Sequence, residues 1–357
     1  MKHSKLYKGI ALAVAASSLT ACKLEDYVIS RLDEVEKSDV EYVVSGVISR
    51  QENVVTVNGV DFDTSNSTVV IDDQSGDLSQ LDDGMYVTVE GSVNNGGSTG
   101  TASKITFENE VKGFVSANNM NSDGSLNVLG QRIIVDQDTR FYSELPSVTN
   151  LDGILVNQFV EVSGYSSGVG SIHATRVEVK SANDFSTAEL ELKGKVSRLT
   201  DSSFYIGDME VAYSDAYLED FGNKSLSEGQ YVEVNSINPP VGQYMAANKI
   251  ELENESHSGH SAEIEGIVSV VANDSTFILN GETIYIDGNT FFKDGPSTSL
   301  IVGSKVEVEG AYDNAGNFIA NQVEFEGSSS SSNDNYDDDD DENEIEDHDD
   351  DRDEDDD

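Results

Sequence analysis

Histidine is the first side chain to consider for catalysis or metal binding, because its pKa lies nearest to neutral pH. Beyond residue 22 the histidines are His173, His257, His260 and His348. Two residues separate His257 from His260, which would suit a loose metal pair, but no third and fourth ligand follows at the spacing of a zinc site. We therefore predict only a weak metal candidate at His257 and His260, a turn residue at His173, and no confident metal site.

Other motifs that carry chemistry are incomplete or missing from the sequence. The run from Asp72 to Asp77 resembles a calcium loop in composition, but it lacks the bidentate Glu that closes an EF-hand. No Gly-x-x-x-x-Gly-Lys phosphate loop occurs. We predict a non-enzymatic protein, with no catalytic residues and no cofactor-binding residues.

The charge of the chain excludes one class of partner. The 357 residues carry a formal net charge of -47, which would repel the phosphates of a nucleic acid. A cationic partner, a divalent metal, or simple solubility in a salty medium all remain compatible with this charge. The single cysteine, Cys22, excludes an intrachain disulfide.

The first 22 residues read as a targeting segment. Lysines precede a short apolar segment at 9–19, which is too short to span a bilayer comfortably and suits a signal peptide. The segment ends in Leu-Thr-Ala-Cys at Cys22, which resembles the lipobox of bacterial lipoproteins. That resemblance implies cleavage before Cys22 and attachment of acyl chains such as palmitate, and Lys23 in place of Asp favours the outer membrane. The alternative is an ordinary secretory signal followed by an incidental cysteine.

The rest of the chain repeats one pattern four times. The opening motif is a short β-type run around a glycine, and its glycines Gly46, Gly113, Gly194 and Gly266 lie 67, 81 and 72 residues apart. Such a period is longer than that of most solenoid repeats and suits small domains in tandem. A middle motif, Leu-x-x-Gly-x-x-Val-x-Val-x-Gly, and a closing motif, Ala-x-x-(Ile/Val)-x-(Phe/Leu/Val), follow in each copy.

Two copies depart from the middle motif. Asn157 replaces the first glycine in the second copy, and Ser236 replaces the later glycine in the third. Asn tolerates the left-handed conformation better than other non-glycine residues, so we predict a tight turn at Asn157. We predict a locally altered bend at Ser236.

The alternation of residues predicts the fold class. In Val306-Glu307-Val308-Glu309 the valines face one way and the glutamates the other, so one face of the strand is buried and one is wet. Closing a small sheet into a barrel removes its exposed edges, and Gly46 or Gly266 would supply a bulge or sharp bend. We predict an all-β chain of four tandem small antiparallel OB-like β-barrels.

These ordered motifs resemble the bacterial "domain of unknown function 5666" family of secreted proteins and lipoproteins, over roughly residues 42–327. The resemblance implies tandem small β-barrels and brings no established activity. We expect a signal peptide at 1–21, a lipidated tether at 22–41, and a disordered acidic tail at 328–357. The four repeats, called units 1 to 4 below, are predicted at 42–110, 111–183, 184–254 and 262–327.

The tail holds 14 Asp and 4 Glu, so it cannot bury enough apolar surface to fold. It would either be an extended, solvated segment that keeps the protein soluble, or bind Ca²⁺ or a basic partner weakly. We predict a lipid-anchored protein of the bacterial cell envelope, either periplasmic or surface-exposed, whose barrels are binding or spacer modules. The alternative is a calcium- or polysaccharide-binding adhesion module, because OB-like barrels can bind sugars through aromatic residues, which unit 3 contains in number.

Overall fold

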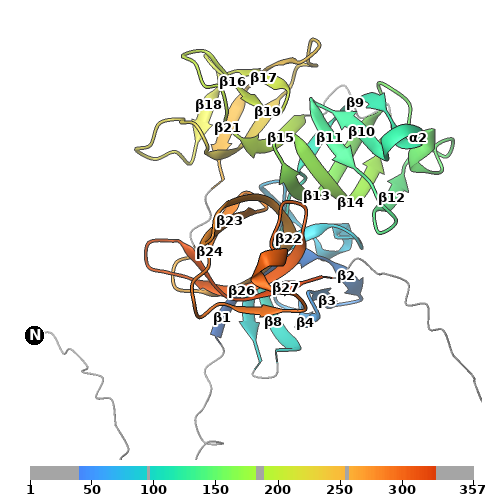
Figure 1. Cartoon of the computed structure of the whole chain (residues 1–357). Helices are drawn as coiled ribbons and strands as arrows, with labels where there is room; N and C mark the ends of the chain where they lie inside the picture. The colour runs from blue at the N-terminus through green and yellow to red at the C-terminus, as the bar shows by residue number, and fades with distance from the viewer. Residues whose placement is uncertain (1–39, 95–96, 182–188, 254–256, 327–357) are drawn as a thin grey trace, which may run out of the picture.

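The structure, a computed structural model, describes residues 40–94, 97–181, 189–253 and 257–326 (Figure 1). The predicted signal peptide, Cys22, almost all of the tether and the acidic tail lie outside the described residues. Within the described ranges, no helix is both long enough and apolar enough to cross a membrane.

The described chain is all-β apart from short helical turns, as predicted. Unit 1 contains β1 (Val40–Val47), β2 (Ser49–Gln51), β3 (Val54–Val57), β4 (Val60–Asp63), β5 (Thr68–Ile71), β6 (Gln74–Gly76), η1 (Leu78–Gln80), β7 (Tyr86–Val93) and β8 (Thr99–Phe107). Unit 2 contains β9 (Val111–Asn118), α2 (Met120–Asp123), β10 (Ser125–Val128), β11 (Gln131–Ile134), β12 (Arg140–Ser143), η2 (Leu151–Gly153), β13 (Phe159–Gly168) and β14 (Ser171–Val179).

The second half of the chain follows the same plan. Unit 3 contains β15 (Leu190–Lys195), β16 (Ser203–Ile206), β17 (Met209–Ala212), β18 (Tyr217–Glu219), β19 (Tyr231–Ser236), β20 (Tyr244–Ala246) and β21 (Lys249–Leu252). Unit 4 contains β22 (Ser261–Asn273), β23 (Thr276–Leu279), β24 (Glu282–Tyr285), β25 (Phe291–Lys293), η4 (Ser297–Ser299), β26 (Lys305–Tyr312) and β27 (Phe318–Phe325).

Strand pairing within a unit returns to its starting strand. In unit 4, β22 pairs with β23, β23 with β24, β24 with β27 in parallel, β27 with β26, and β26 with β22. Figure 1 shows these strands arranged as a ring. Unit 2 repeats the order through β9, β10, β11, β14 and β13. The apolar members of each alternating strand fill the ring, for example Phe277, Val308 and Phe318, which are fully buried.

The expectation of four separate barrels is wrong in one respect, because strands also pair between units. β1 pairs in parallel with β22 and joins units 1 and 4 into a 14-stranded sheet. β9 pairs antiparallel with β15 and joins units 2 and 3 into a 10-stranded sheet, while β16, β17 and β20 form a small third sheet. The units are therefore associated as 1 with 4 and 2 with 3, although units 1 and 2 are joined almost directly in the sequence.

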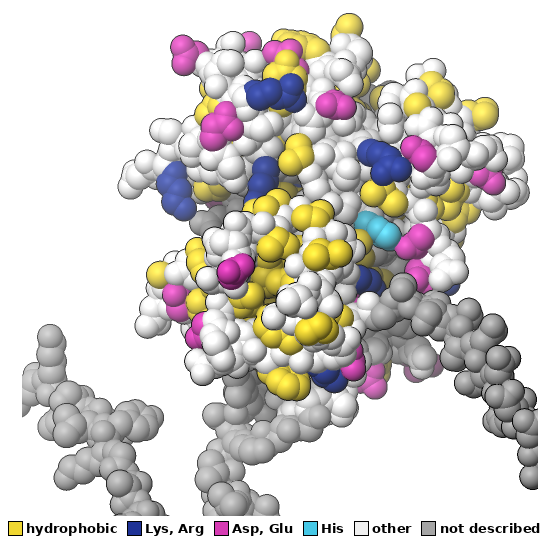
Figure 2. Space-filling view, viewed as in Figure 1, with side chains coloured by type: hydrophobic (Ala, Val, Ile, Leu, Met, Phe, Trp, Pro, Cys, Tyr) yellow, Lys and Arg dark blue, Asp and Glu magenta, His cyan; other side chains and the backbone are white. Residues whose placement is uncertain are grey.

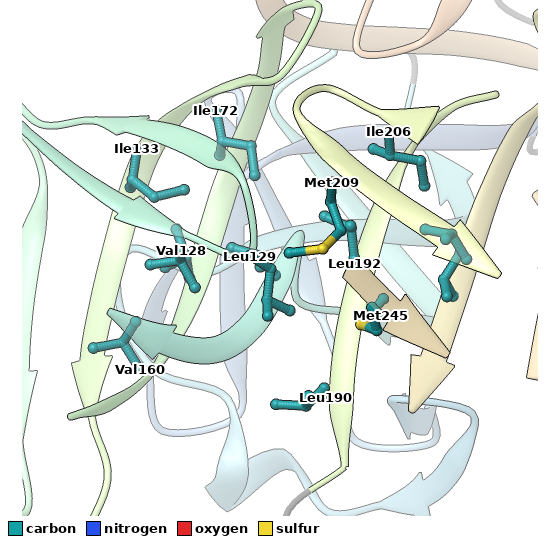
Figure 3. Packing of buried hydrophobic residues seen from close by; sticks show 14 of the residues in the cluster. Val128, Leu129, Ile133, Val160, Ile172, Leu190, Leu192, Ile206, Met209 and Met245 are labelled. Atoms are coloured by element: carbon teal, nitrogen blue, oxygen red, sulfur yellow. The ribbon is translucent and has the colours of Figure 1, made fainter. Parts of the chain in front are cut away.

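The hydrophobic cores differ between these two pairs. Units 2 and 3 share one continuous cluster, and Figure 3 shows Met209 of unit 3 beside Leu129 of unit 2 within it. Units 1 and 4 have separate clusters, although Val43 of β1 packs in that of unit 4. The register explains this difference. Val44 of β1 lies opposite Glu263 of β22, so the face that is interior in unit 1 continues as the exterior face of unit 4.

The two departures from the middle motif lie in different local structures. Asn157 has φ 70°, in the same left-handed region as Gly84 and Gly303, so the tight turn is confirmed. Ser236 is the last residue of β19. At the equivalent Gly310, a Cβ would lie 2.3 Å from the Ile319 carbonyl oxygen of the paired strand. A side chain is therefore compatible with this position only where the strand ends, as it does in unit 3.

The opening glycines have a different role from the predicted bend. A Cβ on Gly266 would lie 2.5 Å from Oδ1 of Asn280, the turn residue of the β23–β24 hairpin. Asn280 uses this space to donate a hydrogen bond from Nδ2 to the Glu265 carbonyl oxygen at 2.8 Å. Asn58 bonds the Ser45 carbonyl in the same way beside Gly46, at 3.3 Å. These glycines give space to a neighbouring turn, while the register shifts of β22 against β23 fall later, between Val268 and Val270 and between Val271 and Asn273.

Candidate functional site

The histidines highlighted by the sequence lie at the periphery. His260 Nε2 lies 2.9 Å from Oε2 of Glu41, and the His257 ring packs against Tyr312 with centroids 5.5 Å apart. Neither histidine belongs to the groups of possible metal ligands within the described ranges. His173 is a residue of β14 rather than of a turn, so that prediction is wrong, and its Nε2 lies 2.7 Å from Oδ2 of Asp136.

Charged residues gather instead where units meet. The sequence predicted that the polar face of each alternating strand is wet, and this is wrong at the junctions. Glu191, Lys193 and Glu233 of unit 3 are only 3–7% exposed, and Glu263 and Glu265 of unit 4 are 7% and 8% exposed. Alternation fixes which residues share a face, but a neighbouring unit decides whether that face meets water.

Lys193 is the centre of the junction where unit 3 meets the end of unit 1 and the start of unit 2. Its ammonium contacts Glu108, and lies 2.9 Å from Oε1 of Glu253 and 3.2 Å from Oε2 of Glu233. Burial alone would lower the pKa of Lys193, but the surrounding carboxylates, Glu253 foremost, raise it well above its ordinary value. The lysine therefore stays charged and neutralises part of the carboxylate charge around it.

The β5–β6 hairpin of unit 1 covers this charged face. Asp72 and Asp73, at the turn of the hairpin, both have positive φ. Oδ2 of Asp72 lies 2.5 Å from Nζ of Lys112, which also lies 2.6 Å from Oε2 of Glu191. Oδ2 of Asp73 lies 3.4 Å from Nζ of Lys249. The segment with the composition of a calcium loop thus acts as an ion-pairing clamp on lysines of the next two units.

Glu265 is the centre of the other junction. Its Oε1 accepts a hydrogen bond from Tyr165 of unit 2 at 2.7 Å and lies 2.6 Å from Nζ of Lys305 in unit 4. The Val47 amide of unit 1 donates to Oε2 at 3.3 Å. Tyr86 of unit 1 donates its hydroxyl to the Glu265 carbonyl oxygen at 3.1 Å. One buried carboxylate therefore links three units.

A cluster of three carboxylates lies beside this centre, on the outer face of unit 4. Glu263 lies directly opposite Glu309 in the β22–β26 ladder, and Glu307 lies opposite Glu265. Ligand oxygens of Glu263, Glu307 and Glu309 all lie within 4.8 Å of one another. No described Lys, Arg or His forms an ion pair with these three residues.

This crowding shifts the acidity of the cluster. Burial raises the pKa of Glu263 to about 7, with a hydrogen bond from Asn58 acting in the opposite direction and Glu309 adding to the rise. Burial, followed by the charges of Glu263 and Glu324, raises the pKa of Glu307 to about 8. Both shifts favour the protonated carboxyl, because an uncompensated negative charge is unfavourable in this setting.

A sequence signal for the junctions exists in the residue before each opening glycine. That residue is Ser45 in unit 1, Lys112 in unit 2, Lys193 in unit 3 and Glu265 in unit 4. The change from lysine to glutamate separates the junction that has a cation at this position from the one that has a carboxylate there, which pairs with Lys305. Without the pairing of β1 with β22, however, the sequence gives no reason to regard this position as buried.

A groove of about 710 Å³ lies between units 2 and 3. Backbone and side chains of β9, β10 and β11 form one wall, and the segment at 239–243 with the β16–β17 turn forms the other. Its lining mixes apolar and polar groups with one cation and one anion, and includes Phe114, Asn127, Arg132, Asp208, Pro240 and Gln243. Two of the aromatic residues of unit 3, Phe204 and Phe221, are buried in the core instead.

Comparison with known proteins identifies the family. The model of the family described as "Domain of unknown function (DUF5666)" matches four times, at residues 43–106, 112–178, 193–251 and 265–324, and the chain belongs to this family. No curated protein matches the chain. Among solved structures, a chain titled "drosophila Unr CSD456" is similar at 13% identity, covering 61% of this chain and 97% of that one. The TM-score is 0.16, too low to support an argument about fold or function.

Proposed function

We propose that this member of the DUF5666 family is a non-enzymatic, lipid-anchored protein of the bacterial cell envelope, whose four β units form a binding or spacer module. The observation that carries the proposal is the order of the sequence: a basic and apolar leader, Leu-Thr-Ala-Cys ending at the sole cysteine, then tandem repeats. Several acyl chains on Cys22 would anchor the chain stably, since each buried methylene contributes roughly 0.8 kcal/mol. Lys23, in place of Asp after the cysteine, favours the outer membrane as the location of the anchor.

Metabolic labelling tests the anchor. Bacteria expressing the chain and fed an alkyne-tagged fatty acid should incorporate the tag into the wild-type protein and fractionate it with membranes. Cys22→Ala should abolish both, whereas Lys23→Ala, the neighbouring matched control, should keep the label. Equal labelling of wild type and Cys22→Ala, or no labelling of either, would contradict the anchor.

The cyclic pairing order in units 2 and 4 supports the finer proposal that the units are variants of an OB-like barrel. In unit 2 the order β9–β10–β11–β14–β13 places β11 and β14 side by side in parallel. In unit 3 the ring is divided, because β20 pairs with β17 while β21 pairs with β19. OB-folds bind oligosaccharides and oligonucleotides on the face formed by strands 2 and 3.

That face favours a polysaccharide as the bound partner. Asn127, Gln131 and Arg132 of the second and third strands of unit 2 line the groove between units 2 and 3. Apolar surfaces with a few amide groups suit the face and hydroxyls of a sugar. The lining holds one basic and one acidic residue, Arg132 and Asp208, and the chain as a whole is strongly acidic, so a neutral glycan fits better than an anionic one.

A glycan-binding assay tests this second candidate. The full chain should retain neutral oligosaccharides on an array, and Asn127→Ala and Gln243→Ala should weaken retention. Asn121→Ala, in the exposed α2 turn outside the groove, is the matched control and should bind normally. Retention that survives both groove substitutions would place any sugar binding elsewhere.

A further inference from the structure

We propose that Glu263, Glu307 and Glu309 form a binding site for a hard divalent cation of the calcium type. The bound cation would stabilise the contact between unit 4 and unit 1. This site is independent of the lipid anchor and of any ligand in the groove. The three side chains come from two adjacent strands, β22 and β26, so the barrel itself holds them together.

The geometry of the cluster suits calcium. Its ligand oxygens lie within 4.8 Å of one another, and two ligands on opposite sides of a calcium ion, each at roughly 2.4 Å, would be about 4.8 Å apart. Three carboxylates leave the remaining places of a coordination shell of about six to eight oxygens to water or second carboxylate oxygens. Glu307 and Glu309 are half-buried, so a cation can reach them from solvent.

An unsatisfied buried oxygen points to a missing partner. Glu263 is 7% exposed, and its Oε1 is shielded from solvent without a hydrogen-bond partner in the described structure. A buried carboxylate oxygen without a partner is unfavourable. The nearest cation across the ladder, Lys305, lies 2.6 Å from Glu265 and 2.7 Å from Glu326 instead. A bound cation would supply a partner for this oxygen, while Asn58 hydrogen-bonds the same carboxyl group.

The other junction shows what occupies such a cluster. Two more groups of three carboxylates have the same spacing, Glu108 with Glu233 and Glu253, and Asp73 with Glu233 and Glu251. The ammonium of Lys193 lies among the carboxylates of the first group, and Lys249 pairs with Asp73 and Glu251 of the second. Of the three groups in the described ranges, only that of Glu263 lacks a protein cation. The repeat thus fills equivalent acidic clusters with lysine in unit 3 and leaves the one in unit 4 to an exchangeable ion.

Calcium titration of the full chain, freed of metal by a chelator, tests the site. Isothermal calorimetry should detect one site of higher affinity above the weak background of the acidic tail. Glu307→Gln and Glu263→Gln should each weaken that site by roughly tenfold or more. Glu90→Gln is the matched control. Glu90 holds the place of Glu309 in unit 1 and pairs with Lys104 at 3.1 Å, so its loss should leave calcium binding unchanged.

Thermal unfolding separates loss of the site from loss of the fold. Calcium should raise the melting temperature of wild type and of Glu90→Gln, and magnesium should do so less. At about pH 8, where Glu307 ionises, Glu307→Gln should melt higher than wild type in chelator, because a repulsive charge is removed, and should no longer respond to calcium. The proposal is overturned if wild type binds calcium only weakly at the tail, or if Glu307→Gln, folded by circular dichroism, keeps the higher-affinity site.

Discussion

The junction between units 2 and 3 and the junction between units 1 and 4 are built from the same strands of the same repeat, yet they neutralise buried charge differently. Lys112 and Lys193 precede the opening glycines in the first, where each forms ion pairs with carboxylates. Glu265 holds that place in the second, where it adds a carboxylate beside Glu263 and Glu307. One position in the repeat therefore decides whether a junction gains a lysine or a further carboxylate, which in the second junction pairs with Lys305.

The largest expected effect comes from removing a built-in cation. Lys193→Met should destabilise units 2 and 3 by about 3–5 kcal/mol, because carboxylates buried around the ammonium lose their partner. Chemical denaturation followed by circular dichroism measures the loss. Lys195→Met, on the same strand but without an ion pair in the described structure, is the control and should have a much smaller effect. Similar losses for both variants would mean that the charge network contributes little.

A second test concerns the shared core of units 2 and 3, which the other junction lacks. Gly207, in the β16–β17 turn, approaches Gly170 of unit 2 so closely that a Cβ would lie 2.6 Å from the Gly170 Cα. Gly207→Ala should therefore cost about 1–3 kcal/mol through overpacking, beyond the cost of its positive φ.

Gly222→Ala separates the contact from the conformation. Gly222 has φ 55° against 57° for Gly207, but nothing lies within 4 Å of its Cβ position. It should cost only the roughly 1–2 kcal/mol of an L-residue in the left-handed region. Equal stabilities of the two variants in urea denaturation would show that the close approach of units 2 and 3 is not a constraint.

The sequence predicts the repeat more completely than its assembly. Period-two alternation, the turn at Asn157 and the loss of a glycine at Ser236 are local properties, and each is visible in one copy compared with the others. The burial of Glu263 depends on β1 pairing with β22, strands about two hundred residues apart in the chain. Short glycine- and valine-rich motifs occur in all four units, so they do not specify which copies pair. The candidate site was missed for this reason, and the histidines considered in its place lie elsewhere.

The third test uses pH. The pKa of Glu307 rises to about 8 and that of Glu263 to about 7, above the ordinary value of 4.5. Between about pH 4.5 and pH 8, the folded state therefore binds more protons at these two carboxyl groups than the unfolded state does. Their contribution to stability is complete below about pH 4.5 and is lost as pH rises toward 8. The groups that face them are Tyr42, Glu265, Lys305, Glu309, Glu324 and Glu326.

In chelator, wild type should lose stability between about pH 5 and 8 relative to Glu307→Gln. After allowance for solvent screening of this half-buried group, the difference should be about 1 kcal/mol at pH 8. Melting temperatures measured across this range provide the comparison, and Glu90→Gln should follow wild type. Parallel curves for wild type and Glu307→Gln would show that the carboxylates of unit 4 do not repel one another as their positions suggest.

The smallest expected effect concerns the ion pairs through which the β5–β6 hairpin of unit 1 contacts units 2 and 3. Asp73→Asn removes an ion pair of 3.4 Å to Lys249, in which the Asp73 side chain is 41% exposed. Such a pair contributes at most about 0.5 kcal/mol, and less at high salt. Asp72→Asn should cost more, because its contact with Lys112 is 2.5 Å and that lysine is only 12% exposed. A double-mutant cycle of Asp72 with Lys112, compared with one of Asp73 with Lys249, measures both couplings. If the exposed pair coupled as strongly as the buried one, burial would not be what distinguishes the two charged contacts of this hairpin.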